Sequence, residues 1–184
     1  MNDENGTHIG GIEKRDIVIA DYDPAWSVTF QSHADAITQA LGNDALRIEH
    51  MGSTAVPGLA AKPIIDILLV VKDSGNEESY LSRMEGAGYE LRIREPDWHQ
   101  HRMFRTPERD VHIHVYSLGC PEIDRVILFR DRLRSNPDDR SRYEQTKRRL
   151  AEQGWESMDD YAKEKTEVVE KIIAAATSEH KNHS

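Results

Sequence analysis

The stretch IEHMGSTAVPGLAAKPIIDILLVV, residues 48–71, decides the fold of this chain. Its last part, residues 64–71, is short and rich in aliphatic and β-branched side chains, a pattern typical of a buried strand. Residues 46–50 predict another strand, which runs into the turn Met51-Gly52-Ser53. Proline and glycine in the intervening segment predict a loop, so we expect strand, turn, loop and strand in that order.

Asp66 stands inside the apolar strand, where an unpaired carboxylate would cost several kcal/mol. It must therefore pair with a cation or face a cleft. The Gly52-Ser53 turn can present backbone N–H groups to an anion, Thr54 adds a hydroxyl donor, and Lys62 can neutralise phosphate charge. A metal held by Asp66 could bridge phosphate oxygens. The spacing alone leaves open an ordinary turn with a structural Asp66–Lys62 pair.

The flanking segments predict an α+β fold. Asp23 and Pro24 predict the N-cap and first residue of a helix that ends at Gly42. The other expected elements are a short strand at 17–19, a helix at 77–86, a strand at 89–94, a hairpin of 102–106 with 110–116, and helices at 121–133, 138–152 and 157–176.

A single domain of residues 16–176 accounts for most of the 184-residue chain, with a helical C-terminal part at about 121–176. We expect residues 1–15 to be disordered or loosely attached. Residues 177–184 are expected to form a polar tail.

Composition argues against several classes of protein. No apolar run approaches the roughly 20 residues that span a bilayer, so no membrane partner is expected. The N-terminus lacks the apolar stretch of a secretory signal, and Cys120 is the single cysteine; both favour a cytoplasmic location. The net charge of -9 argues against extensive nucleic-acid binding. Nothing in the sequence fixes the oligomeric state.

Residues 48–71 closely resemble the signature segment of the GrpB family. Further landmarks of that family follow in the chain, and the resemblance covers about residues 16–176. These landmarks are DYDPAW at 21–26, a glycine-ended helix before YELR at 89–92, HIHVY at 112–116, LFRDRLR at 128–134, YEQTKRRLA at 143–151 and YAKEK at 161–165.

This resemblance implies a nucleotidyltransferase-like mixed β-sheet with flanking helices and a C-terminal helical segment. In that superfamily a Gly-Ser turn binds phosphates, which Gly52 and Ser53 match here. The next strand carries two metal-binding carboxylates one residue apart, and a third carboxylate comes from a later strand. Asp66 matches the first carboxylate, but Leu68 stands at the second position, and the third is not evident.

His112 and His114 lie two residues apart on the expected later strand, so both face the same side. They are candidate replacement ligands that would form a two-histidine, one-carboxylate set with Asp66. The superfamily implies a divalent metal such as magnesium, but imidazole ligands favour a transition metal such as zinc. The alternative is that both rings meet polar partners on a half-exposed strand. His99 and His101 form a second such pair, which we place on a loop or strand edge outside the site.

The remaining candidates are His50 and a set of basic and aromatic side chains in the expected C-terminal helices. His50 is either a general acid or base or a hydrogen-bond donor that shapes the turn. The helical candidates for phosphate or nucleotide binding are Arg130, Tyr143, Lys147, Tyr161 and Lys165. Two tyrosine–lysine pairs in this set are spaced i, i+4 and so share a helix face, which suits either a base-plus-phosphate ligand or a solvated helix.

The expected partner is therefore a nucleotide or another small phosphate-bearing molecule. The first hypothesis is an enzyme that transfers a nucleotidyl or phosphoryl group with a divalent metal. The second is a binding protein that keeps the fold without the chemistry. A third is a metal-dependent hydrolase that uses Asp66, His112 and His114.

Overall fold

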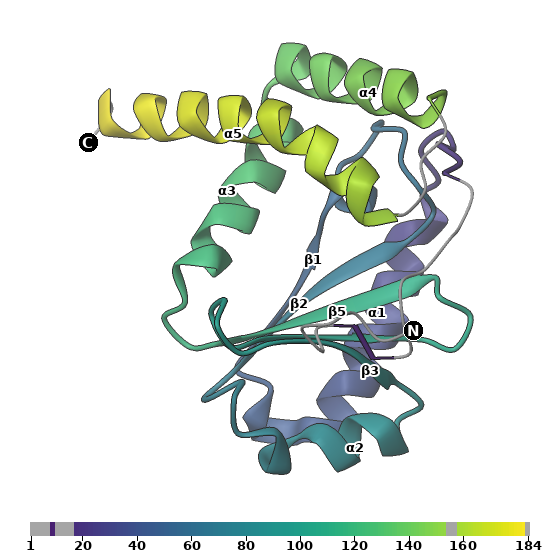
Figure 1. Ribbon diagram of the computed structural model, residues 1–184, viewed down its shortest axis with the longest axis vertical. Helices are drawn as coiled ribbons and strands as arrows, with labels where there is room; N and C mark the ends of the chain where they lie inside the picture. Colours follow the sequence, from purple (N-terminus) through teal and green to yellow (C-terminus); the bar gives the residue numbers. More distant parts are fainter. Residues whose placement is uncertain (1–7, 10–16, 154–157, 183–184) are drawn as a thin grey trace.

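The strand that carries Asp66 lies second in a five-stranded mixed sheet (Figure 1). The computed structural model describes residues 8–9, 17–153 and 158–182. The strands are arranged in the order β1-β2-β5-β4-β3. Their bounds are β1 Arg47–Met51, β2 Ile65–Val71, β3 Glu90–Glu95, β4 His101–Arg105 and β5 Val111–Ser117.

Strand β2 pairs antiparallel with β1 on one side and parallel with β5 on the other. Strand β4 then pairs antiparallel with both β5 and β3. The expected hairpin at 102–106 and 110–116 is confirmed by β4 and β5. Strand β2 lies inside the sheet and both of its faces are covered by apolar clusters, which explains its apolar composition.

Helices flank this sheet, as the sequence predicted. The α-helices are α1 Ala25–Leu41, α2 Leu81–Gly86, α3 Pro121–Ser135, α4 Pro137–Ala151 and α5 Met158–Asn182. Short 3-10 turns are η1 Gly42–Asp44, η2 Ser53–Ala55 and η3 Glu77–Ser79.

Alternation along β2 divides the core into two parts. Ile67 and its same-face neighbours pack with Ile37 of α1 and Met84 of α2 in the largest apolar cluster. Leu68, on the opposite face, packs with Ile123 of α3. Asp66 shares the face of Leu68, which places it on the side of the C-terminal helices.

Helices α3, α4 and α5 lie together at the end of the molecule opposite α2 (Figure 1). Leu133, Tyr143 and Ile172, one from each helix, form an apolar cluster with Val56 and Leu59. Because Val56 and Leu59 belong to the loop between β1 and β2, this cluster fixes the helices over the Gly-Ser turn.

The helix signals expected at Asp23 and Gly42 are borne out. The Asp23 carboxylate accepts a 2.8 Å hydrogen bond from the Ala25 N–H at the start of α1. Gly42, with φ 54°, ends that helix. Asn136 caps α4 through a 2.9 Å bond from the Asp139 N–H. Helix α5 continues to Asn182, past the expected end at 176.

The expected strand at 17–19 is wrong. Ala20 instead makes an isolated bridge with Ala61, because the segment runs past the sheet and meets only the loop before β2. Most of 1–15 lies outside the described residues, but His8 bridges Ile93 at the free edge of β3. No helix in the described part of the chain is long and apolar enough to cross a membrane.

Candidate functional site

Asp66, His112 and His114 come together because β2 and β5 pair in parallel. The register places Asp66 beside His112, with His114 two residues further along the same face. The Asp66 Oδ1 atom lies 3.8 Å from His112 Nδ1 and 3.6 Å from His114 Nε2. One ligand atom from each residue lies within 4.8 Å of the others. All three side chains are partly exposed, so a small ligand can reach them.

Gly52 lies directly against the Asp66 carboxylate. Its φ is 71°, and a Cβ atom there would lie 2.5 Å from Asp66 Oδ2. Only glycine combines that backbone conformation with so close an approach. The Gly-Ser turn therefore contacts the carboxylate itself, and Ser53 on the same turn faces the cavity beyond it.

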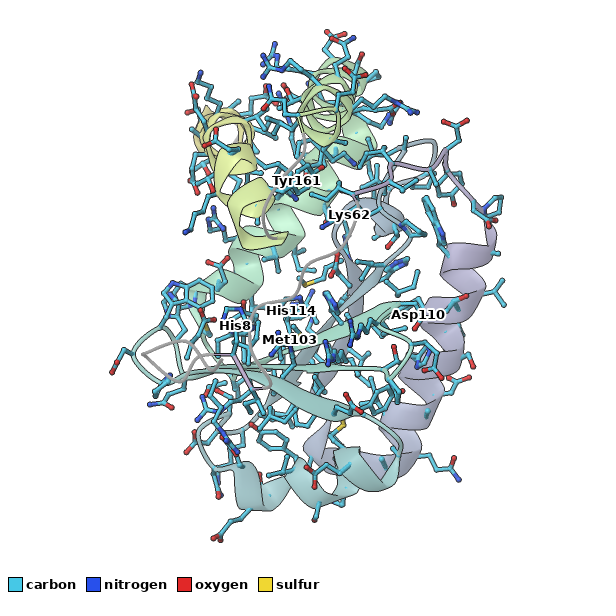
Figure 2. All side chains as sticks on the ribbon, turned by 45° about the vertical axis from the view of Figure 1, so that its right-hand side comes forward. His8, Lys62, Met103, Asp110, His114 and Tyr161 are labelled. Carbon is cyan, nitrogen blue, oxygen red and sulfur yellow. The ribbon has the colours of Figure 1, made fainter. Side chains whose placement is uncertain are left out.

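Lysines from three segments line a cavity of about 340 Å³ next to the histidines. Of the lining residues, Lys62, Met103, His114 and Tyr161 are labelled in Figure 2. Lys62 precedes β2, Lys147 belongs to α4 and Lys165 belongs to α5. The Lys62 and Lys165 ammonium groups lie 5.0 and 4.9 Å from the centre of the Tyr161 ring. The residues that line the cavity are Ser53, Lys62, Ile64, Asp66, Ile93, Met103, His112, His114, Lys147, Tyr161, Ala162 and Lys165.

Lys147 is almost completely buried, with 2% of its surface exposed. Its ammonium group lies 4.8 Å from the centre of the Tyr143 ring and donates a hydrogen bond to the Ala60 carbonyl. Burial, together with a smaller effect of the positive charge of Lys165, lowers its pKa to about 7. Burial also lowers the pKa of Lys165, against the opposing effect of Asp66. Both ammonium groups therefore gain from an anion in the cavity.

The Asp66 carboxyl is held in its ionised form. Burial acts to raise its pKa, but the nearby rings of His114 and His112 and the charge of Lys62 outweigh that effect, and the pKa is lowered. A carboxylate that is ionised at neutral pH is suited to hold a cation.

His50 and Thr54 lie behind the turn and do not line the cavity. His50 is stacked on Phe30 at 4.7 Å, and its Nε2 lies 3.0 Å from Thr54 Oγ1. The Thr54 hydroxyl also donates to the Ile64 carbonyl at 3.3 Å. Burial lowers the pKa of His50 to about 4, so its ring is neutral at physiological pH. Of its two expected roles, this geometry fits the one that shapes the turn, and Thr54 acts with it.

Arg130 and Tyr143 also lie outside the cavity lining. Arg130 donates to the Glu49 carboxylate and to the His50 carbonyl at 2.8 and 2.9 Å, so it ties α3 to β1. Its expected phosphate contact does not fit this position. Tyr143 is buried, and its ring lies against the Lys147 ammonium group, so it supports a residue that does line the cavity.

His101, which was expected to lie outside the site, contacts the candidate ligand His114, although it is not among the residues that line the cavity. His101 begins β4, is buried, and its Nε2 lies 3.1 Å from His114 Nδ1. Met103 and Ile93, which do line the cavity, come from the same hairpin as His101. The alternation of His101 and Met103 on one strand was the signal for a shared face, but strand pairing was needed to show which face.

The three-residue set fits a transition metal better than magnesium. A tetrahedral zinc ion about 2.1 Å from each ligand needs ligand atoms roughly 3.4 Å apart, close to the separations of Asp66 from both histidines. Magnesium prefers six oxygen ligands, and Asp66 is the only carboxylate among the lining residues. Leu68 is fully buried in the apolar cluster beneath α3, so its side chain does not reach the cavity.

A mixed sheet that carries an Asp-His-His cluster beside a lysine-lined cavity defines an α+β protein with a candidate metal and anion site. The family model described as GrpB protein matches residues 16–175. The chain therefore belongs to the GrpB family.

Comparisons with individual proteins agree with this membership. A UPF0157 protein of Halalkalibacterium halodurans is 50% identical over 162 residues, which cover 88% of this chain and 83% of the relative. The crystal structure of conserved protein GrpB from Enterococcus faecalis has a TM-score of 0.79 and 36% identity, covering 89% of this chain and 99% of that one. A structure of the Cid1 poly(U) polymerase matches weakly, with a TM-score of 0.47 and 9% identity over 71% of this chain and 45% of that one.

Proposed function

We propose that this GrpB-family protein binds a nucleotide or another phosphate-bearing ligand in the cavity and transfers a nucleotidyl or phosphoryl group with a divalent metal. The observation that carries the proposal is the meeting of two sites in one cavity. Asp66, His112 and His114 offer metal ligands on one side. Lysines from three separate segments face them from the other.

The lysines are suited to hold phosphate charge. Lys62, Lys147 and Lys165 each line the same cavity, and the Lys62 and Lys165 ammonium groups lie over the Tyr161 ring. Ser53 adds a hydroxyl donor at the cavity wall. Phosphoryl transfer needs mostly positioning and charge neutralisation, which this set of donors supplies.

Asp66, His112 and His114 would hold the metal beside the phosphate group that reacts. A divalent ion held there would supply a Lewis acid that polarises a phosphate oxygen. Asp66 contributes negative charge to that end, while His112 and His114 contribute neutral donors. In the transfer, an acceptor oxygen forms a bond to phosphorus as the bond to the leaving phosphate oxygen breaks.

A binding protein without catalysis is the second candidate, and Leu68 favours it. This position would hold the second carboxylate of a two-metal site, but Leu68 is packed in the core. The loss of one metal position would remove the usual two-metal support for attack and departure while leaving phosphate binding intact.

The first experiment is a calorimetric titration of the purified protein with nucleoside triphosphates and inorganic triphosphate, each with zinc, manganese or magnesium. The same titration is made with Asp66→Asn and with Lys165→Met. Lys163→Met is the matched control, because Lys163 lies on the same helix but is exposed. We expect Lys165→Met to weaken triphosphate binding about 10- to 100-fold, since a hydrogen bond to a charged group contributes about 1.5–3 kcal/mol.

Binding that needs a divalent metal and disappears in Asp66→Asn supports the metal-linked site. Release of pyrophosphate or transfer of label to an acceptor distinguishes the transferase from the binding protein. Hydrolysis that releases inorganic phosphate, with zinc as the only added metal, favours the hydrolase. The proposal fails if no phosphate ligand binds under any of these conditions.

A further inference from the structure

A hydrogen-bonded chain that is buried at its middle residue, His101, extends from His114 away from the cavity. His101 Nε2 lies 3.1 Å from His114 Nδ1. On the other side of the His101 ring, Nδ1 lies 2.6 Å from Glu95 Oε2. Glu95 ends β3 and His101 begins β4, so one hairpin supplies both partners. His101 is 4% exposed, which leaves little room for water to replace either contact.

The order of groups in this chain selects one tautomer for each ring. The Glu95 carboxylate is an acceptor, so the proton of a neutral His101 lies on Nδ1. His101 Nε2 then carries a lone pair and accepts a hydrogen bond from His114 Nδ1–H. A neutral His114 protonated on Nδ1 has its lone pair on Nε2. That atom lies on the cavity side, 3.6 Å from Asp66 Oδ1. This separation is longer than a hydrogen bond, so the closer His101 contact sets the tautomer.

We propose that Glu95 and His101 are positioning residues that fix the tautomer and orientation of His114, so that its Nε2 lone pair faces the metal position beside Asp66 and His112. This inference rests on the proposed function for the identity of the bound group. Outer hydrogen-bond partners of this kind orient ligating histidines and typically change metal affinity 10- to 100-fold. Here the Glu95 carboxylate acts on His114 through the imidazole ring of His101.

Ring packing holds the hydrogen-bonded chain of Glu95, His101 and His114, here called the relay, in one geometry. The His101 ring stacks on His114 with 5.2 Å between centres and an interplanar angle of 15°. Its other neighbours are Tyr116, at 4.9 Å, and the edge of Trp98, at 5.4 Å. Rotation of His101 about its side chain would break both hydrogen bonds and both stacks.

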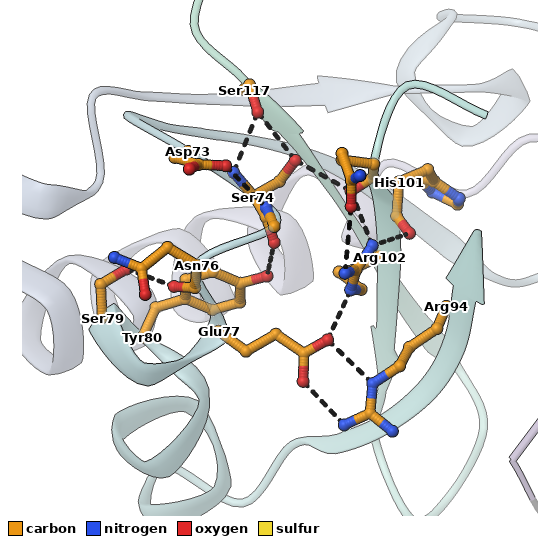
Figure 3. Close-up of polar contacts among 12 residues, drawn as sticks. Asp73, Ser74, Asn76, Glu77, Ser79, Tyr80, Arg94, His101, Arg102 and Ser117 are labelled. Atoms are coloured by element: carbon orange, nitrogen blue, oxygen red, sulfur yellow. Dashed lines mark hydrogen bonds and ion pairs between the residues drawn. The ribbon is translucent and has the colours of Figure 1, made fainter. Parts of the chain in front are cut away.

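The backbone before His101 is held in an uncommon conformation. His99 and Gln100 have φ values of 55° and 52°, a region that side chains other than glycine seldom adopt. Arg102 donates to the carbonyls of Gln100 and His101 at 2.9 and 3.0 Å. The Ser74 hydroxyl donates to the Gln100 carbonyl at 2.9 Å (Figure 3). These bonds fix the turn that presents the His101 ring.

The direct test is the tautomer of His114 in the metal-free protein, read from long-range ¹H–¹⁵N spectra of histidine at about pH 8, where ordinary imidazoles are neutral. We expect the Nδ1–H form of His114 in the wild type. His101→Phe keeps an aromatic ring but has no acceptor, so the preference for Nδ1–H should be lost. His101→Gln keeps a side-chain carbonyl that can accept the same proton, so the preference should be restored at least in part. His99→Asn is the matched control, since it removes a neighbouring exposed imidazole and suits a positive φ.

Zinc titration of the same proteins gives the second readout. Affinity should fall about 10- to 100-fold in His101→Phe, recover partly in His101→Gln and stay unchanged in His99→Asn. A His114 ring that is protonated on Nε2 in the wild type overturns the relay, as does wild-type zinc affinity in a folded His101→Phe. If the wild type binds no metal, the proposed function fails, and the tautomer alone then decides whether the relay exists.

Discussion

The polar network around Glu77 and the cavity around Asp66 both contain charged side chains that lie against the same sheet. In the network the opposite charges are paired with one another, whereas in the cavity positive charges outnumber negative ones. Glu77 accepts hydrogen bonds from Arg94 at 2.8 and 2.7 Å and from Arg102 at 2.6 Å (Figure 3). These contacts hold the pKa of Glu77 below its usual value, with the Arg94 bond as the largest cause. The network joins the loop after β2 to the β3–β4 hairpin.

The cavity instead collects cations around one carboxylate. Lys62, Lys147 and Lys165 line it together with Asp66, and burial lowers the pKa of Lys147 to about 7. Charge matched within the protein, as at Glu77, supports the fold. Positive charge concentrated beside a cavity, as at Lys147, favours an anionic ligand. The difference gives a criterion for separating structural ion pairs from a binding site, and four variants test it.

The largest effect is expected at Leu68, two residues beyond Asp66 on β2. Leu68→Asp places a charge in an apolar cluster, so the free energy of unfolding should fall by about 4 kcal/mol or more. Urea denaturation measures it, with Leu118→Asp as the control, because Leu118 is 68% exposed. Near-wild-type stability of Leu68→Asp would mean that this position can turn toward the cavity.

The next largest effect on stability is expected in the Glu77 network. Glu77→Ala leaves Arg102 buried without its carboxylate partner, which should lower the free energy of unfolding by about 3 kcal/mol. Glu78→Ala, at an exposed neighbouring position, should change it by less than about 0.5 kcal/mol. Equal stability of the two variants in chemical denaturation would remove the structural role assigned to the network.

Gly52 and Gly58 have similar backbone conformations, so a comparison of their alanine variants distinguishes backbone strain from contact with the Asp66 carboxylate. Gly52 and Gly58 have φ values of 71° and 76°, so the backbone strain of alanine at either position should cost more than about 1 kcal/mol of stability. Only Gly52→Ala meets the Asp66 carboxylate, since nothing lies within 4 Å of a Cβ at Gly58. We therefore expect zinc affinity to fall in Gly52→Ala alone. Calorimetry with zinc measures this, and an equal loss in both variants would show that the turn acts through backbone strain.

The smallest effect is a dependence on pH. The pKa of Lys147 is about 7 in the folded protein and 10.5 as its ordinary value, so the unfolded chain binds more protons between these pH values. The free energy of unfolding should therefore rise with pH across that window, by about 1 kcal/mol between pH 7 and 8. Triphosphate affinity should change in the opposite direction, because Lys147 loses its charge. Lys147→Met should flatten both trends, which thermal unfolding and calorimetry at several pH values can measure. Trends that persist in Lys147→Met would assign them to another group.

Local patterns were enough to predict most of the fold. Asp23, Gly42 and Asn136 act within a few residues of their own positions, so the ends of their helices are encoded locally. Residues 64–71 predict a buried strand for the same reason. Residues 17–19 look like a strand, but a strand also needs a partner along its length, which only the rest of the fold can provide.

The candidate site divides in the same way. The sequence by itself determined that Asp66 is a charged residue in a buried strand and that His112 and His114 share a face. Only the tertiary structure brought β2 and β5 into parallel register, turned Arg130 toward Glu49 and placed His101 against His114. Side-chain periodicity follows from local backbone geometry, whereas contacts between distant strands and helices depend on how apolar faces pack and on strand register, which no single segment specifies.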